Sequence, residues 1–232
     1  MTNPQITREN PLGTRPDQGW TCVLFDLDGT LIDSAPGIID SLKRVLTGAG
    51  IPVPPEAILT TYVGPPLLRA LADDFGLDHE RAHEILTVYR RDYAEHGALD
   101  TAVFPGLRGI LERLTAAGVP LAVATSKPET QAVRILEHLN VAAFFEVIAG
   151  AHDDESHSGK AEIVANALER LRARGVNTDN PVMVGDRIYD VDGAAAHDIP
   201  TVLVEWGYGS PSEAHDALAV VHSTEQLQKI LE

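Results

Sequence analysis

Short apolar runs recur along the chain and alternate with longer stretches in which apolar residues return every three or four positions. The short runs are typical of buried strands in a parallel sheet, and the longer pattern is typical of amphipathic helices. Strands that alternate with helices predict an α/β fold with a doubly wound parallel sheet. The expected strands are Thr21–Phe25, Pro120–Ala124, Glu146–Ala149, Pro181–Val184, Thr201–Val204 and Ala219–Val221. The expected helices are Leu107–Ala117, Pro128–Leu139, Lys160–Arg172, Val191–His197 and Glu225–Leu231.

One stretch of the chain breaks this alternation. Between Ser34 and Phe104 the pattern is helical and no strand stands out, and the stretch far exceeds the ~2–6 residues that usually connect a strand to a helix. We therefore expect an all-helical cap domain over residues 35–104, inserted into a Rossmann-like core of residues 20–34 and 105–232. Residues 1–19 are polar and are expected to form a flexible tail. The expected cap helices are Pro36–Leu46, Glu56–Tyr62, Leu67–Phe75 and Glu80–His96.

Two carboxylates stand at the end of the first expected strand. Asp26 still belongs to the apolar run, and Asp28 precedes a Gly-Thr turn. Ligands of doubly wound sheets bind at the carboxyl ends of the strands, and the alternation of a strand lets both acids face one crevice. A turn explains Asp28, because Asp-Gly is a common turn pair, but it does not explain Asp26. Two buried like charges require a cation or a substrate, so the pair is a candidate site.

A second strand end repeats this pattern. The run Val182–Val184 stops at Gly185-Asp186, and Asp190 follows one helical turn later on the same side. An acid that caps the next helix explains either residue alone, since such caps are frequent. Two carboxylate-rich strand ends in one chain favour a shared site.

A third strand end and a later helix start add hydroxyl and ammonium groups. The strand Pro120–Ala124 is followed by Thr125, Ser126 and Lys127. Lys160 opens a later helix and is the only lysine between Lys127 and Lys229. Taken alone, Lys160 is better explained as an ordinary solvated lysine, and Lys127 is equally well explained as a surface charge near a helix start.

Composition narrows the classes of partner. The net charge is −16, from 34 acidic and 18 basic residues. We expect no nucleic-acid partner and no binding to an anionic membrane, because both require a basic surface. The same charge repels phosphate esters, so a phosphate site needs a local cation. Cys22 is the single cysteine, which excludes an intrachain disulfide. No run approaches the ~18 apolar residues of a membrane span, and a cytoplasmic location is the expectation.

These motifs, in this order, resemble those of the haloacid dehalogenase superfamily of phosphatases. The first motif is Asp26-Leu27-Asp28-Gly29-Thr30, the second is Thr125, the third is Lys160, and the fourth runs from Gly185 to Asp190. The resemblance covers about Thr21 to Leu231. Within the superfamily the chain looks most like the branch of phosphoglycolate phosphatases and 5'-nucleotidase-like phosphatases, which carries a helical cap. The segments Val63–Leu67 and Gly207–Ser210 are similar to that branch.

The resemblance implies a role for each motif residue. Asp26 is expected to be the nucleophile that forms an aspartyl-phosphate, and Asp28 the general acid and base. Mg²⁺ is expected as the cofactor, held by the carboxylates of Asp26 and Asp186 and by the backbone carbonyl of Asp28. Thr125 and Lys160 are expected to hold the phosphoryl oxygens.

Other residues are expected to support the site. Asp190 is expected to orient Lys160 or to bind the metal through water. Ser126 stands where similar sequences often have Asn, and Arg187 is expected to pair with Asp186 or Asp190. Three cap positions are candidates for substrate specificity: Gly64, Pro65 and Arg69. Similar sequences carry an Arg directly after Leu67, and here Leu68 intervenes.

The function expected from these features is Mg²⁺-dependent hydrolysis of a small phosphorylated metabolite, as in phosphoglycolate phosphatases. A 5'-nucleotidase or a sugar-phosphate phosphomutase would use the same core, because the motifs do not decide whether water or a sugar hydroxyl accepts the phosphoryl group. A catalytically silent binding protein on the same fold is an alternative from another class. The sequence indicates neither the substrate nor the oligomeric state.

Overall fold

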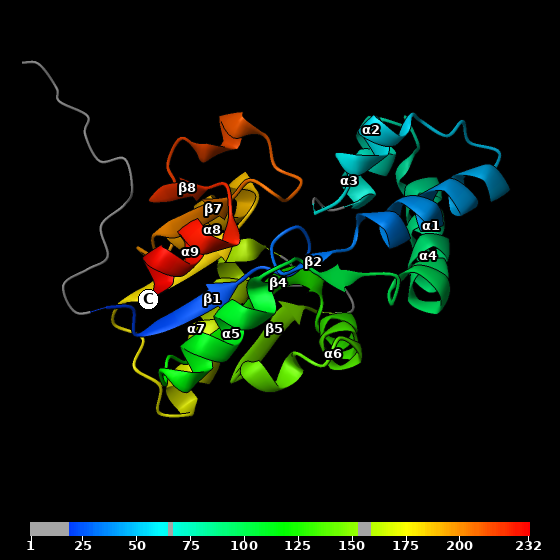
Figure 1. The fold of residues 1–232 in the computed structure, drawn as a ribbon. Coiled ribbons are helices and arrows are strands. Elements are labelled where there is room, and N and C mark those ends of the chain that lie inside the picture. The colour runs from blue at the N-terminus through cyan, green and yellow to red at the C-terminus, as the bar shows by residue number, and fades with distance from the viewer. Residues whose placement is uncertain (1–18, 65–66, 153–158) are drawn as a thin grey trace, which may run out of the picture.

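A six-stranded parallel sheet forms the centre of the molecule (Figure 1). The computed structural model of the protein describes residues 19–64, 67–152 and 159–232. The strand order is β5-β4-β1-β6-β7-β8, so β1 and its neighbours β4 and β6 occupy the middle of the sheet. Val23 of β1 pairs with Leu121 on one side and with Val182 on the other. The strands are β1 (Cys22–Phe25), β4 (Leu121–Pro128), β5 (Val147–Ala151), β6 (Pro181–Gly185), β7 (Thr201–Val204) and β8 (Ala219–Val221).

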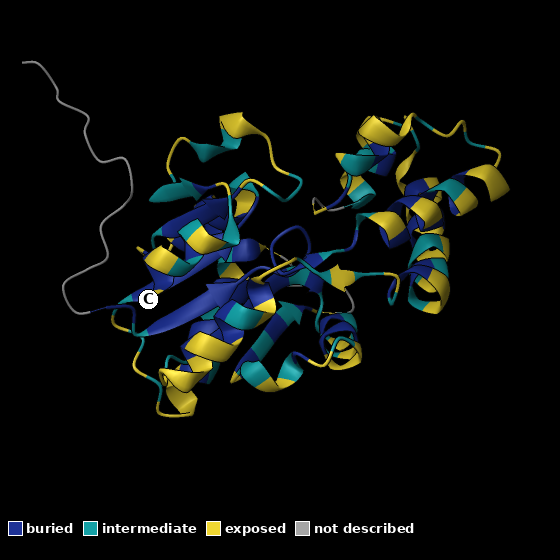
Figure 2. Cartoon of the chain, viewed as in Figure 1, coloured by how far each residue is buried: buried dark blue, intermediate teal, exposed yellow. Residues whose placement is uncertain are grey.

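Helices cover both faces of the sheet because successive strand residues point to opposite sides. Val23 and Phe25 of β1 belong to the hydrophobic cluster that includes residues of α5, α6 and α9, whereas Cys22 and Leu24 pack with residues of α7 and α8. Figure 2 shows the central strands buried and the helices exposed on their outer sides. This arrangement confirms the predicted doubly wound α/β fold. The core helices are α5 (Leu107–Ala116), α6 (Glu129–His138), α7 (Lys160–Ala173), α8 (Ile188–Ala195) and α9 (Thr224–Leu231), with short 3₁₀ turns η2 (Ala142–Phe144) and η3 (Pro211–Ala214).

Most core elements differ from the expected boundaries by one or two residues, and two differ by more. Strand β4 continues past Ala124 to Pro128, because its pairing with β5 persists through a register shift between Thr125 and Pro128. Helix α8 begins at Ile188 rather than Val191. The side chain of Asp190 accepts a hydrogen bond from the backbone N–H of Arg187 and so completes the first turn.

The residues between β2 and β3 are helical. They form α1 (Ala35–Gly48), α2 (Glu56–Thr60), α3 (Leu67–Asp73), α4 (His79–Asp92) and the π-helical turn η1 (Tyr93–Gly97). In Figure 1 these helices lie to one side of the sheet. Among the described residues, no helix is long and apolar enough to cross a membrane. We refer to α1 through η1 as the cap helices.

A small antiparallel ribbon joins the cap helices to the core. It consists of β2 (Ile32–Asp33) and β3 (Ala102–Val103), in which Ile32 pairs with Val103. The expectation of no strand between Ser34 and Phe104 was therefore wrong. A strand of two residues is too short to produce a period-two pattern in the sequence, so its pairing arises from tertiary structure. The single helix expected over Glu80–His96 is divided in the same way, into α4 and the π-helical turn.

Two glycines allow α1 and η1 to pack closely. A Cβ atom added to Gly37 would lie 2.1 Å from the carbonyl oxygen of Gly97, and one added to Gly97 would lie 2.5 Å from the carbonyl oxygen of Gly37. Such distances are far below van der Waals contact with backbone atoms that have little room to move. The two backbones can therefore approach only because neither residue carries a side chain.

We predict that Gly37→Ala destabilises the protein by about 1–3 kcal/mol, the usual result of overpacking. Gly48 lies on the same helix, and a Cβ added there meets no atom within 4 Å. The control Gly48→Ala is therefore expected to be neutral or to gain about 0.5–1 kcal/mol, because Ala lowers the entropy of the unfolded chain. Urea unfolding of both variants tests this. Equal stability of the two would show that the glycine contact is not tight.

Candidate active site

The motif residues meet at the carboxyl ends of the central strands. Asp26 follows β1 directly, Asp186 follows β6, Thr125 lies in β4, and Lys160 is the first residue of α7. Because β1 pairs with both β4 and β6, these strand ends are neighbours. Asp26, Thr125 and Lys160 border a cavity of about 30 Å³. Its wall consists of Asp26, Asp28, Gly64, Thr125, Ser126, Lys127, Lys160, Arg187, Tyr189 and Asp190.

Lys160 is the buried cation between two of the acids. Its Nζ atom lies 2.7 Å from Asp26 Oδ1 and 2.6 Å from Asp190 Oδ1. Burial alone would lower the pKa of Lys160, but the carboxylates of Asp190 and Asp26 raise it above its usual value. Lys160 is therefore a fixed positive charge in the site. The structure brings Asp190 to Lys160, as the sequence analysis had expected.

Two of the buried acids in the site have raised pKa values. Burial raises the pKa of Asp26 to about 6, with Lys160 opposing the shift and the nearby Asp190 adding to it. Burial, followed by the charges of Asp190 and Asp26, raises the pKa of Asp186 well above its usual value. One lysine thus does not balance three buried carboxyl groups.

This donor set fits a hard divalent cation. Carboxylate oxygens of Asp26, Asp186 and Asp190 lie within 4.8 Å of one another. Asp190 is the most heavily engaged of the three, because its Oδ1 pairs with Lys160 and its Oδ2 accepts from two backbone N–H groups, whereas each oxygen of Asp186 accepts one hydrogen bond. The carboxylates of Asp26 and Asp186 are therefore the better candidates for direct ligands, and oxygen ligands of this kind suit Mg²⁺.

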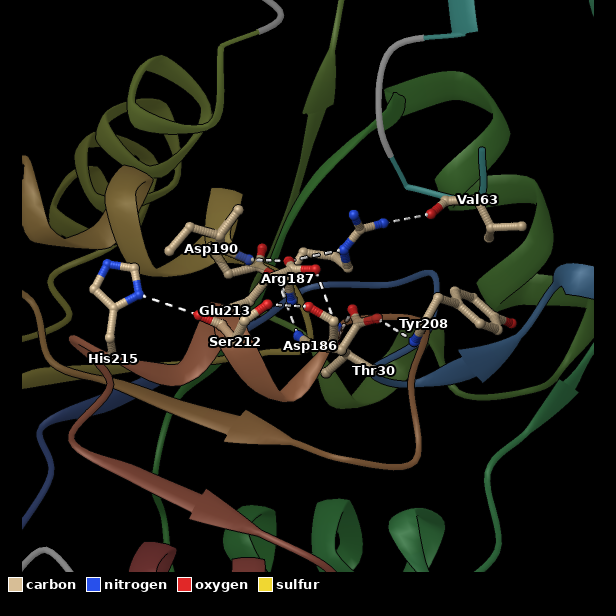
Figure 3. Close-up of polar contacts among 11 residues, drawn as sticks. Thr30, Val63, Asp186, Arg187, Asp190, Tyr208, Ser212, Glu213 and His215 are labelled. Carbon is tan, nitrogen blue, oxygen red and sulfur yellow. Dashed lines mark hydrogen bonds and ion pairs between the residues drawn. The ribbon is translucent and has the colours of Figure 1, made fainter. Parts of the chain in front are cut away.

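Asp186 is held in place from two sides (Figure 3). Thr30 donates its hydroxyl hydrogen to Oδ1 at 3.2 Å, and the backbone N–H of Tyr208 donates to Oδ2 at 2.7 Å. A Cβ added to Gly29 or Gly207 would lie within 2.4 Å of Asp186 Oδ2. These glycines, which belong to two of the segments singled out in the sequence, allow the backbone to pass directly over the carboxylate.

Thr125 and Ser126 lie where the sequence analysis had expected them, in the wall of the small cavity. The Thr125 hydroxyl is buried and accepts a hydrogen bond from the backbone N–H of Lys127 at 3.2 Å. Its own hydrogen remains available to a ligand oxygen. Ser126 is half-buried beside it.

Lys127 belongs to the site, although the sequence left its place open. Its side chain is 6% exposed, and its Nζ lies 3.0 Å from Asp28 Oδ2. The same ammonium donates to the hydroxyl of Tyr93 at 3.1 Å and lies 4.7 Å from the centre of the Tyr93 ring. Lys127 therefore connects Asp28 of the core to the π-helical turn η1. The sequence feature that pointed to Lys127 is its position directly after the hydroxyl pair Thr125-Ser126 at a strand end.

Arg187 also reaches the cap helices, as Figure 3 shows. Its Nε donates to Glu213 Oε2 at 3.0 Å, and its Nη1 donates to the carbonyl oxygen of Val63 at 3.0 Å. The expected pairing with the carboxylates of Asp186 or Asp190 is not observed; instead the guanidinium pairs with Glu213. Gly64 is next to this contact and lines the cavity. Glu213 comes from η3, far along the chain, which sequence reasoning had no means to anticipate.

The structure does not bring Arg69 into the site. Its side chain is 80% exposed and forms an ion pair with Asp73 one helical turn away, at 3.2 Å. The displacement of the arginine by one position, noted in the sequence, places it on the outer side of α3. Pro65, the third cap candidate, lies outside the described residues.

Tyr208 is a functional candidate that the sequence analysis had not assigned. Its hydroxyl donates to Asp33 Oδ1 at 2.7 Å and accepts from the backbone N–H groups of Ser34 and Ala35 at 2.9 and 3.0 Å. These residues connect β2 to α1. Tyr208 thus links the loop that holds Asp186 to the start of the cap helices.

Comparison with known proteins identifies the family. The model of the haloacid dehalogenase-like hydrolase family matches residues 23–204. The chain belongs to this family, as the resemblance of its motifs predicted.

Relatives of this chain have different names. The tyrosine-protein kinase PtkA of Mycobacterium tuberculosis (strain ATCC 25618 / H37Rv) is 48% identical over 84% of this chain, which spans only 65% of the length of that relative. A 5'-nucleotidase of Pseudomonas aeruginosa is 34% identical, over 90% of this chain and 95% of its own. A plasmid phosphoglycolate phosphatase of Cupriavidus necator is 33% identical, over 91% of this chain and 93% of its own.

A solved structure agrees with the fold. The crystal structure of a predicted phosphatase from Clostridium acetobutylicum superposes with a TM-score of 0.84 at 36% identity, and the match covers 91% of this chain and 97% of the other.

The raised pKa of Asp26 predicts a dependence of stability on pH. A carboxyl group whose pKa is higher in the folded state binds its proton more tightly there, so it destabilises the folded protein as the pH rises from about 4 to about 6. In EDTA, we expect Asp26→Asn to gain stability relative to the unmodified protein over this interval, by about 3 kcal/mol at full deprotonation. Urea unfolding at several pH values measures the difference. A difference that does not change with pH would contradict the raised pKa.

Proposed function

We propose that this protein is a Mg²⁺-dependent phosphatase that hydrolyses a small phosphate monoester through an aspartyl-phosphate intermediate on Asp26. The observation that carries this proposal is the contact of the buried Asp26 carboxylate with Lys160, in a cavity also bordered by Asp28 and Thr125. Membership in the haloacid dehalogenase-like hydrolase family supports it. The phosphatase and nucleotidase names of relatives indicate the reaction class.

In the first step, a carboxylate oxygen of Asp26 attacks phosphorus and the bond from phosphorus to the ester oxygen breaks. Asp28 gives its proton to the departing oxygen, so that an alcohol leaves and not an alkoxide. One oxygen of Asp28, Oδ1, is buried and receives no hydrogen bond from the described residues. This oxygen is available for proton transfer to a bound substrate.

In the second step, water attacks the aspartyl-phosphate. Asp28, now ionised, accepts a proton from the water as its oxygen bonds to phosphorus, and the bond from phosphorus to Asp26 breaks. Inorganic phosphate leaves, and both acids return to their starting states. Two steps with a covalent intermediate replace one difficult attack of water on a phosphate dianion.

The charge of the phosphoryl group must be neutralised in both steps. The residues that would hold Mg²⁺ are Asp26, Asp186 and the backbone carbonyl of Asp28, and the ion would supply positive charge to the phosphoryl oxygens. Lys160 adds a second, permanent positive charge next to the nucleophile. The hydroxyl of Thr125 donates to a phosphoryl oxygen. Because the site is buried, these interactions are stronger than in water.

The cap helices are proposed to form a domain, residues 35–104, that excludes water and selects the alcohol part of the ester. The contacts of Tyr93 with Lys127 and of Val63 with Arg187 support this role, because they bring cap atoms to the cavity wall. Phosphoglycolate and nucleoside monophosphates are candidate substrates by likeness to the named relatives.

The relative named a tyrosine-protein kinase supports a second candidate function, phosphorylation of protein tyrosine. Incubation with ATP, Mg²⁺ and a tyrosine-containing protein, followed by detection of phosphotyrosine, distinguishes the two. Phosphotyrosine formation without phosphate release from any ester would favour this second function. Phosphoryl transfer between two hydroxyls of a sugar phosphate would instead favour a phosphomutase.

We predict that Asp26→Asn lowers phosphate release from a panel of metabolite esters at least about a thousandfold, since an amide cannot form the intermediate. EDTA is expected to abolish the activity of the unmodified protein, and excess Mg²⁺ to restore it. Asp192→Asn is the matched control, because Asp192 is exposed on α8. Turnover that persists in Asp26→Asn would overturn the covalent mechanism.

A further inference from the structure

A second cavity of about 160 Å³ lies beside the phosphoryl site, between the cap helices and the core. It shares Asp28, Gly64, Ser126 and Lys127 with the smaller cavity around Asp26. A substrate whose phosphate lies against Asp26 would therefore extend its alcohol part into this space. The larger cavity is thus the place for the leaving group. The inference rests on the proposed phosphatase function.

The wall of this cavity is largely apolar and aromatic. Ile38 and Leu42 of α1 and Leu86 of α4 supply aliphatic side chains, and three tyrosines complete the wall: Tyr62, Tyr89 and Tyr93. The rings of Tyr89 and Tyr93 stack with their centres 5.9 Å apart. An aromatic ring of a ligand can contact these tyrosines in offset or edge-to-face geometry, and such contacts stabilise the complex by more than the burial of apolar area alone. Arg90 and Gln131 add polar groups to the wall.

Lys127 lines both cavities, and its ammonium group is already engaged. Lys127 is paired with Asp28 and also contacts the hydroxyl and the ring of Tyr93. A carboxylate on the leaving group would have to compete with Asp28 for this ammonium. An uncharged ring can occupy the space without disturbing the pair.

The volume sets the size of the group. A cavity of about 150 Å³ lined by apolar side chains holds one benzene molecule. The cavity of about 160 Å³ therefore matches one six-membered ring with its linking carbon atoms. A complete nucleoside, with a base and a ribose, would extend beyond this space.

We propose that the preferred substrates are phosphate monoesters whose alcohol carries a single aromatic ring, and that the ring lies between the cap helices and the core among Tyr62, Tyr89 and Tyr93. The phosphate end is held by the groups around Asp26. The ring supplies binding energy that the small phosphoryl site alone does not provide.

The test compares 2-phenylethyl phosphate with ethyl phosphate. Both have a primary alcohol as leaving group with similar reactivity, so the ratio of their kcat/KM values reports the binding of the ring. With Mg²⁺ present, we expect the phenylethyl ester to be favoured at least about tenfold, as expected for burial of a ring. Phosphoglycolate and a nucleoside monophosphate, measured in parallel, are expected to fall below the phenylethyl ester. A ratio near one, or a higher kcat/KM for either of these two, would overturn the proposal.

A matched pair of variants locates the effect. Leu67 is half-buried in the cavity wall, and Leu67→Trp fills part of the space. Val88 is 41% exposed on α4, and it is not part of this wall. The ratio of phenylethyl to ethyl ester is expected to fall toward one in Leu67→Trp and to be retained in Val88→Trp. An unchanged ratio in both variants would place the ring elsewhere.

A binding measurement separates this proposal from the proposed function. Phosphonates cannot be hydrolysed as esters, so titration calorimetry with 2-phenylethylphosphonate and ethylphosphonate tests the cavity without turnover. Tighter binding of the phenylethyl compound by at least about tenfold supports the aromatic pocket even where no ester is hydrolysed. In that case only the phosphatase function fails. Equal binding of the two phosphonates overturns the pocket even where both esters are hydrolysed.

Discussion

The ion pairs of Lys160 with Asp26 and Asp190 are the interaction on which the site depends. Three buried carboxyl groups within 4.8 Å of one another would repel strongly, and burial of an unpaired charge is among the most costly arrangements in a protein. Lys160 reduces the repulsion among these carboxyl groups, but one positive charge does not neutralise all three. Burial and the neighbouring carboxylates together raise the pKa values of Asp26 and Asp186, so both acids are in a setting that a bound cation would stabilise in its ionised form.

The parallel sheet creates this arrangement by its topology. Because β1 lies between β4 and β6, the residues that follow these strands meet at one edge of the sheet. Lys160 arrives from the start of α7, which packs on the face that Leu24 also contacts. Residues that are far apart in the chain thus become neighbours without long loops. The fold fixes the positions of the charged atoms, and it does so with rigid elements, as a preorganised site requires.

The sequence predicted the fold of the core well for a physical reason: buried parallel strands are continuous apolar runs, and a charged residue that ends such a run is conspicuous. Asp26 and Asp186 were singled out in this way, whereas Lys160, which opens a helix, was singled out by its position relative to the other motifs. The ribbon of β2 and β3 was missed because a two-residue strand has no periodicity. The partner of Arg187, Glu213, was missed because it arrives from a separate surface turn. Contacts of this kind depend on tertiary structure and leave no local pattern.

Three contacts make the cap helices and the charged site a single unit. Lys127 bonds to Asp28 and to Tyr93. Arg187 bonds to Glu213 and to the carbonyl oxygen of Val63. The Tyr208 hydroxyl accepts a hydrogen bond from the start of α1, and the backbone N–H of Tyr208 donates to Asp186. In each contact, a residue of the site forms a hydrogen bond with a residue of the cap helices or of the segments that join them. A displaced cap would remove the Tyr93 hydroxyl and ring from the buried ammonium of Lys127 and leave its ion pair with Asp28. The position of the cap and the electrostatics around the acid are therefore coupled, and a substrate that fills the space between cap and core acts on both.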